Sequence, residues 1–110
     1  MALQHPDTFQ AIADRTRRDI LLLLSKDKLS INSLAANFDI SRPAVSKHVK
    51  VLSEAGLIMI TDQGRERYCE LNPRGFEELR EWLDYYDRFW KEKLSNLEIL
   101  LHKKSKHKLR

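Results

Sequence analysis

Residues 41–57 are the segment of this 110-residue chain that most constrains its fold. Ser41 is a residue type that accepts hydrogen bonds from free N–H groups at a helix start, and Pro43 follows in the first turn, where its missing N–H costs nothing. Gly56 suits the left-handed position that ends a helix. The segment therefore predicts a short helix over residues 41–55, whose apolar residues recur at helical spacing on one side: Val45, Val49 and Leu52.

The opposite side of this predicted helix carries short hydroxyls and cations, and residues 41–50 contain no acid. One face would hold the helix against the protein, while the other suits an anionic partner, as in a DNA recognition helix. The candidate DNA-binding residues of this segment are Ser41, Arg42, Pro43, Ser46, Lys47, His48 and Lys50.

A second short helix is predicted immediately before this one. Ser30 suits its first position, and Ile31, Leu34, Ala35 and Phe38 follow at helical spacing. Two short helices with a tight connection are typical of a helix-turn-helix. An ordinary helical hairpin within a core is the alternative for these two segments, but the tight turn and the basic outer face together favour DNA binding.

A β-hairpin is predicted over residues 57–71. Residues 57–61 and 65–71 are rich in branched or aromatic side chains, and the three residues between them include Asp and Gly. Arg65 and Arg67 lie two apart, so they are expected on one face of the second strand, where they could contact phosphates or a minor groove. A solvated strand edge is the alternative.

Two helices are predicted before these elements. Asp7 is expected to cap a short first helix that carries Phe9, and Asp14 a second helix whose apolar run at residues 20–24 predicts a buried centre of the domain. The order of elements predicts a mostly α fold with a small β-hairpin: a winged helix-turn-helix with a long C-terminal dimerisation helix.

That last helix is predicted over residues 73–101. Its 29 residues correspond to a rod of about 44 Å, and its apolar stripe is too long to be covered by the rest of the chain. We expect it to pair with its own copy, or with the first helix of a second subunit. A core helix within the subunit and an apolar ligand pocket are the alternatives. The candidate dimerisation residues are Phe9, Trp82, Leu83, Tyr86, Phe89, Trp90 and Leu97.

The positive net charge of the chain comes from its C-terminus. Residues 102–110 hold five Lys and Arg and no acid, so residues 1–101 carry 15 positive and 16 negative charges. The sequence therefore predicts a winged-helix domain over residues 1–101 and a basic, flexible tail over 102–110. The tail is expected to act on DNA through diffuse charge only.

The remaining composition indicates a cytoplasmic protein with no membrane association. No apolar run approaches the roughly twenty residues that cross a bilayer, and the N-terminus lacks the blocks of a signal peptide. The single cysteine, Cys69, rules out an internal disulfide framework and fits a reducing compartment.

The chain resembles the ArsR-type bacterial winged helix-turn-helix repressors over residues 6–101. The resemblance is carried by FQAIADRTRRDILLLL, by SINSLAANFDISRPAVSKHVKVLSEAGLI and by GRERYCELNP. It implies a homodimer that binds double-stranded operator DNA, with an unknown effector. Arg15 departs from the proline of many relatives, which leaves the start of the second helix less rigid.

The resemblance raises the possibility that the protein senses a metal ion, but this chain lacks the expected ligands. The positions that match the family's paired cysteines are Ser30 and Asn32, and neither offers a thiolate. His102 and His107 lie in a lysine-rich segment without supporting carboxylates, and Cys69 is expected to be packing. We therefore predict no metal and no cofactor.

Enzymatic function is not predicted either. The three glycines form no phosphate-cradling loop, and Ser46 and His48 lie two apart on a helix, so they cannot form a nucleophile–base pair. The sequence predicts a transcriptional repressor that reads duplex DNA with helix 41–55 and wing 57–71. The alternatives are a winged helix used only for protein–protein contact and a metal- or ligand-responsive repressor.

Overall fold

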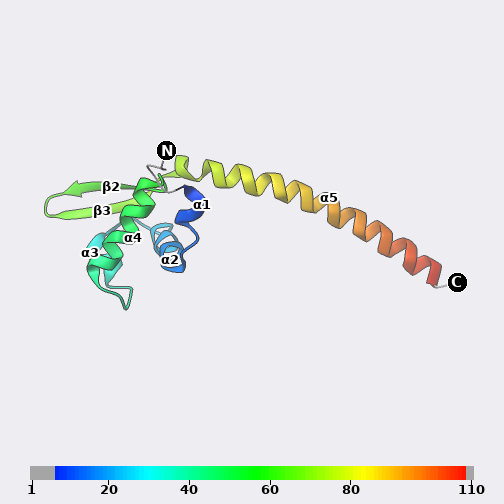
Figure 1. Cartoon of the computed structure of the whole chain (residues 1–110), viewed down its shortest axis with the longest axis horizontal. Coiled ribbons are helices and arrows are strands. Elements are labelled where there is room, and N and C mark those ends of the chain that lie inside the picture. Colours follow the sequence, from blue (N-terminus) through cyan, green and yellow to red (C-terminus); the bar gives the residue numbers. More distant parts are fainter. Residues whose placement is uncertain (1–6, 109–110) are drawn as a thin grey trace. The chain divides into compact units, whose positions relative to one another are not determined.

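The computed structural model describes residues 7–108, with side chains for residues 7–103 (Figure 1). It confirms the mostly α winged helix-turn-helix, and divides into two compact units that meet between Glu78 and Leu79. The elements are, in order, α1 (Thr8–Ala11), α2 (Arg15–Leu24), β1 (Leu29–Ser30), α3 (Ile31–Ala35), α4 (Arg42–Glu54), β2 (Ile58–Gln63), β3 (Glu66–Leu71), a 3-10 turn (Pro73–Phe76) and α5 (Glu77–Lys108).

Side-chain caps fix the start of each of the first four helices. Asp7, Asp14, Ser30 and Ser41 each accept a hydrogen bond from a backbone N–H in the first turn of the helix that follows. These groups have no partner within the helix, so a cap contributes about 1 kcal/mol at each start. The caps predicted from the sequence at these positions are confirmed.

Fewer side chains of α2 belong to the core of the first unit than the sequence predicted. The prediction that α2 is buried around residues 20–24 is wrong, because only Ile20 and Leu24 are buried and Leu22 is 61% exposed. A helix of this small domain has neighbours on one side only, so an apolar run cannot be covered all round. The other buried apolar side chains of this unit are Ala11, Ile31, Leu34, Val45, Val49, Leu52, Leu57, Ile58 and Cys69.

The β-sheet has three antiparallel strands in the order β1-β3-β2, of which the sequence predicted two. The added strand, β1, pairs Leu29 with Cys69 and Ser30 with Tyr68. Ser30 is thus both a strand residue and the cap of α3, which places the start of the helix-turn-helix against the wing. Two residues are too few to show an alternation of apolar and polar side chains, so the sequence pattern could not predict this strand.

The turn of the hairpin is shorter than predicted, at residues 64–65 in place of 62–64. β2 extends through Gln63, β3 begins at Glu66, and Gly64 and Arg65 form the two-residue turn between them. Gly64 has a φ of +63°, which a turn of the II′ type needs at its first central position. Arg65 therefore lies at the tip of the wing, and the prediction that it shares a strand face with Arg67 is wrong.

Two backbone segments, residues 52–57 and 72–75, meet closely where α4 ends. Gly56 has a φ of +82°, and the Leu57 N–H donates to Leu52 O at 3.0 Å in a helix-ending motif. Asn72 donates from Nδ2 to the Gly56 carbonyl at 2.9 Å. A Cβ on Gly75 would lie 1.8 Å from this carbonyl oxygen, so only glycine fits there.

The last helix differs from the prediction at both ends. The 3-10 turn Pro73–Phe76 precedes it, so α5 begins at Glu77, and its helical backbone continues to Lys108, beyond the predicted end at Leu101. The side chains of residues 104–110, and with them most of the predicted tail, lie outside the described residues. None of the described helices is long and apolar enough to cross a membrane.

Gly75→Ala is expected to destabilise the protein by about 1–3 kcal/mol, because the new methyl group overlaps backbone that has nowhere to move. Gly64→Asn is the control for a positive φ without overlap, because a Cβ there meets open space and Asn tolerates positive φ better than most residues, so its loss of stability should be the smaller one. Urea unfolding followed by circular dichroism measures both variants. Equal stability of Gly75→Ala and wild type would contradict the close contact.

Asp14→Ala is expected to destabilise the protein by about 1 kcal/mol at neutral pH, through loss of the α2 cap. The Arg17 backbone N–H, aided by the charges of His48 and Arg17, lowers the pKa of Asp14 below 3.8. The charged carboxylate therefore adds stability above its unfolded pKa, and this contribution disappears as the pH falls through the lower folded pKa.

The difference in unfolding free energy between wild type and Asp14→Ala should accordingly shrink below about pH 4. Asp19→Ala, which removes an exposed carboxylate from the same helix without removing a cap, is the control. A difference that stays constant down to pH 2 would show that the charge of the carboxylate adds nothing to the cap.

Candidate nucleic-acid interface

The outer face of α4 is held in place by its inner face. Val45, Val49 and Leu52 are at most 1% exposed, which fixes the rotation of the helix about its axis. Arg42, Pro43, Lys47 and Lys50 are exposed on the other side, and Ser46 is half-buried. Ser41 is exposed too, but its hydroxyl oxygen accepts the Ala44 N–H at 3.2 Å and so serves as the cap.

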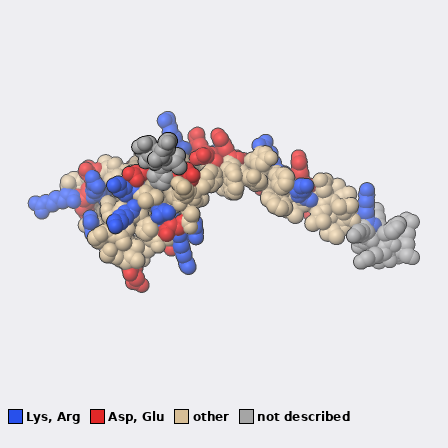
Figure 2. Space-filling model, in the orientation of Figure 1, with Lys and Arg blue, Asp and Glu red and all other residues tan. Residues whose placement is uncertain are grey.

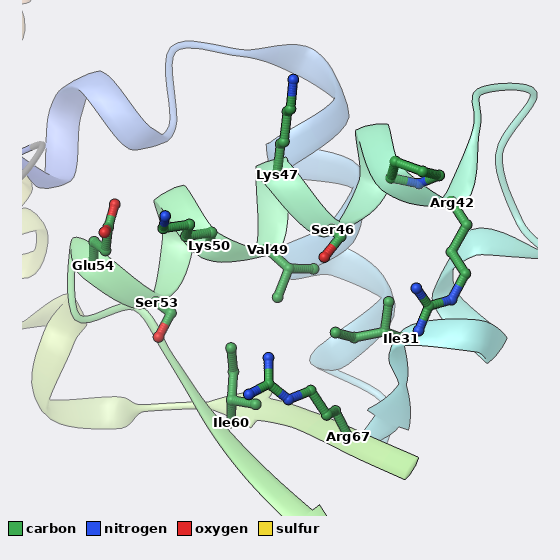
Figure 3. Close-up of a pocket in the computed structure, with 11 residues that line it drawn as sticks. Ile31, Arg42, Ser46, Lys47, Val49, Lys50, Ser53, Glu54, Ile60 and Arg67 are labelled. Carbon is green, nitrogen blue, oxygen red and sulfur yellow. The ribbon is translucent and has the colours of Figure 1, made fainter. Parts of the chain in front are cut away.

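An open groove of about 570 Å³ lies between α4 and the hairpin (Figure 3). Ser46 and Val49 point into this groove from α4, and Ile60 and Arg67 face them from β2 and β3. Lys47 points away from the strands. Apolar side chains thus form part of the groove wall, with cations, hydroxyls and the carboxylate of Glu54 around it.

Arg42 makes a contact that the sequence did not predict. Its Nε donates a hydrogen bond to Asn32 Oδ1, the side chain of the second residue of α3. Both residues line a polar cleft of about 320 Å³ beside the groove. Asn32 is exposed, so nothing in the apolar pattern of α3 could have identified it as part of this site.

The wing arginines occupy different positions. Arg67 lies opposite Asp62 in the β2–β3 register, and its Nε donates to Asp62 Oδ1 at 3.0 Å. Both partners are more than 60% exposed, so this ion pair orients Arg67 more than it stabilises the fold. Arg65 is at the wing tip and, together with Arg42 and Arg67, lines the polar cleft.

His48 is turned away from the other candidate residues, towards α1 and α2. Its Nδ1 lies 3.3 Å from Arg17 Nη1 and 3.8 Å from Asp14 Oδ2. Arg17 also donates from Nε to Ala11 O at 2.7 Å and from Nη2 to Gln10 O at 3.2 Å, so it joins α1, α2 and α4. The structure brings the other α4 candidates together without His48.

Ser30 and Asn32, which match the family's paired metal-binding cysteines, make hydrogen bonds within the protein. The Ser30 hydroxyl caps α3 and donates to Ser33 Oγ at 3.0 Å, and Asn32 binds Arg42. Within residues 7–103, no three His, Cys, Asp or Glu side chains are grouped as a metal site requires. Cys69 is buried in the sheet, and desolvation raises the pKa of its thiol to about 11, which makes it a poor ligand or nucleophile at neutral pH.

The predicted dimerisation residues of α5 form an aromatic and aliphatic surface on that helix. Tyr86 contacts Trp82 and Phe89, with ring centroids 4.9 and 6.2 Å away, and Phe89 meets Trp90 edge to face at 5.5 Å. Trp82, Leu83, Tyr86, Phe89, Trp90 and Leu97 are between 38% and 58% exposed. Phe9, the remaining candidate, is half-buried on α1.

Charge is distributed unevenly over the described surface. Lys and Arg side chains gather on the visible face of the first unit, whereas uncharged surface predominates along α5 (Figure 2). On α5, two cations are paired with acids one turn away: Lys91 with Asp87 at 3.0 Å and Arg80 with Asp84 at 3.8 Å. The surface that suits phosphate therefore belongs to the first unit.

Comparison with known proteins agrees with this geometry. A family profile described as "Helix-turn-helix domain" matches residues 12–61. The HTH-type transcriptional regulator Rv2034 of Mycobacterium tuberculosis is 41% identical over 97 residues, which cover 87% of this chain and 88% of that protein. The transcriptional repressor SdpR of Bacillus subtilis is 34% identical over 77 residues, covering 70% and 86%.

A solved structure supports the same assignment at the level of the fold. The crystal structure of an ArsR family transcriptional regulator matches with a TM-score of 0.69 and 36% identity, over 76% of this chain and 91% of that one. The sequence resemblance is thereby confirmed, and the chain belongs to the ArsR-type winged helix-turn-helix family of transcriptional regulators.

Proposed function

We propose that this protein is a homodimeric repressor that binds double-stranded operator DNA with α4 and the wing. The observation that carries the proposal is the two-sided build of α4, with a buried seam of Val45, Val49 and Leu52 and an outer face of cations and hydroxyls. SdpR of Bacillus subtilis and an arsenical resistance operon protein of Escherichia coli are both named repressors, which supports repression here.

In this proposal the N-terminal part of α4 enters the major groove. Arg42, Ser46 and Lys47 would meet base edges or phosphates there, because the first turns of a recognition helix lie deepest in the groove. The wing would contact the neighbouring backbone or minor groove through Arg65 at its tip and Arg67 on β3. His48 would orient the helix through Arg17 and Asp14 instead of contacting DNA.

The homodimer would be formed mainly by α5. Eleven large apolar side chains of this helix, the six candidates among them, are between 38% and 58% exposed, an arrangement that soluble monomers rarely tolerate over a continuous surface. At about 25 cal/mol per Å² of buried apolar area, covering them with a second copy provides several kcal/mol towards association. Phe9 would add to this interface from α1.

The relatives are transcriptional regulators, and we infer that this chain too acts without catalysis, in the cytoplasm where bacterial DNA is found. A purely protein-binding winged helix is the weaker alternative, because that use favours an apolar or acidic outer face on α4. The exposed face here carries Arg42, Lys47 and Lys50.

Lys47→Ala is expected to cost about 1–3 kcal/mol of operator binding, because Lys47 is exposed on the proposed reading face and the fold does not depend on it. Gel-shift titration on duplexes selected by the wild-type protein from a random-sequence library measures the loss. Lys26→Ala, an exposed lysine after α2, is the control with the same charge change. Wild-type affinity in Lys47→Ala would remove this residue from the interface.

Trp90→Glu combined with Leu97→Glu is expected to convert the protein into monomers or aggregates and to weaken operator binding, because two charges would enter the proposed interface. The matched control is Arg88→Gln with Ser95→Glu, which keeps the spacing of seven residues and the change of two charges on exposed positions. Sedimentation at micromolar concentration decides. A wild-type protein that sediments as a 13.0 kDa monomer would refute the dimer.

A further inference from the structure

The first residue of the recognition helix is held by an amide from the helix before it. Arg42 is the N1 residue of α4, and its Nε donates to Oδ1 of Asn32 in the first turn of α3. Both side chains are exposed, so neither is placed there by core packing. The contact exists because the turn of the helix-turn-helix brings the starts of α3 and α4 together.

The atoms used in this contact decide what Arg42 can still do. A guanidinium has five N–H donors in a rigid plane, and the bond to Asn32 uses the one on Nε. The Nη1 and Nη2 groups at the far end remain able to donate two parallel hydrogen bonds, the geometry that matches O6 and N7 of guanine. Asn32 is neutral, so it orients the cation without cancelling its charge.

Arg67 is held in a related way, but by an acceptor of different charge. Its Nε also donates to a side-chain oxygen, that of Asp62 at 3.0 Å, and all four residues line the same polar cleft. The acceptor is charged in the wing and neutral at α4. A neutral acceptor leaves the full positive charge of the arginine available to its partner.

We propose that Asn32 is a positioning residue that fixes the Arg42 guanidinium for base readout, so that the sequence preference of the protein depends on a residue outside the recognition helix. The proposal rests on the proposed function, in which α4 reads operator DNA. An unheld arginine loses rotamer freedom on binding, whereas one already fixed by Asn32 has less to lose.

The test is a double-mutant cycle on the duplex that wild-type protein selects from a random-sequence DNA library. Asn32→Ala is expected to weaken binding roughly three- to tenfold, the range of one intramolecular hydrogen bond. It should also relax discrimination at the base pair where Arg42→Ala relaxes it. In the Arg42→Ala background, Asn32→Ala should cause no further loss.

The salt dependence shows whether Asn32 positions Arg42 for a base or for a phosphate, because only loss of an Arg42–phosphate contact would lower the slope. Asn32→Ala should leave the slope of affinity against salt unchanged, since no phosphate contact by a cation is lost. Asn37→Ala is the matched control, because Asn37 is an exposed residue just after α3 whose Nδ2 donates to Ser33 O at 2.9 Å, within the same segment. It should bind as wild type does.

A second variant tests the role of Nε independently of Asn32. Arg42→Lys keeps the charge but has neither Nε nor a planar fork, so it should lose base discrimination about as much as Arg42→Ala. Circular dichroism checks the fold of each variant. Full discrimination by Arg42→Lys would show that charge alone suffices and would overturn the proposal, whatever the behaviour of Asn32→Ala.

The other possible results of the double-mutant cycle each have a different meaning. Additive losses in the double variant would mean that Asn32 contacts DNA by itself. Tighter binding by Asn32→Ala would mean that the bond to Asn32 keeps Arg42 from contacting DNA. Either result overturns the proposal. A loss in Arg42→Ala with none in Asn32→Ala overturns the positioning role alone. Wild-type affinity in Arg42→Ala, or no duplex recovered by selection, overturns the proposed DNA contact of this residue as well.

Discussion

The buried seam of α4 is the contact on which the rest of the interface depends. Val45, Val49 and Leu52 lie in the core, and their spacing leaves one orientation of the helix in which all three are buried. This orientation exposes the cations of α4 and forms one wall of the groove whose other wall is the hairpin. A polar side chain at any of these three positions would therefore disturb binding by rotating or releasing the helix.

Polar contacts then fix the positions of arginine side chains around the helix that the buried seam has oriented. Asn32 binds Arg42, Asp62 binds Arg67, and Arg17 connects α1 and α2 with His48 on α4. The bonds to Asn32 and Asp62 are exposed, and each uses one donor of its arginine and leaves others available, whereas Arg17 uses Nε, Nη1 and Nη2. Exposed bonds of this kind add little to the free energy of folding, because water competes for the same groups. Their effect is on where charges lie and how freely they move, which matters for recognition more than for stability.

The long helix α5 carries a different kind of surface. Its aromatic side chains touch one another along the helix while staying about half exposed, and two of its cations, Arg80 and Lys91, pair with acids one turn away. Such a surface suits apolar burial and not phosphate. Separating a charged reading surface from an apolar association surface would allow dimerisation to set the spacing of two α4 helices while leaving their outer faces accessible.

The sequence by itself determined the elements whose signals are local. Capping residues, the seam of α4 and the apolar stripe of the last helix are fixed by neighbours a few residues apart, so these elements and the exposed side of α4 could be predicted. Only the tertiary structure decided the rest. The strand β1, the carbonyl that requires glycine at Gly75, the turned-away His48 and the Asn32–Arg42 bond all join distant segments, and no local pattern encodes such contacts. Burial of α2 on one side only has the same origin, since it depends on which neighbours the folded chain supplies.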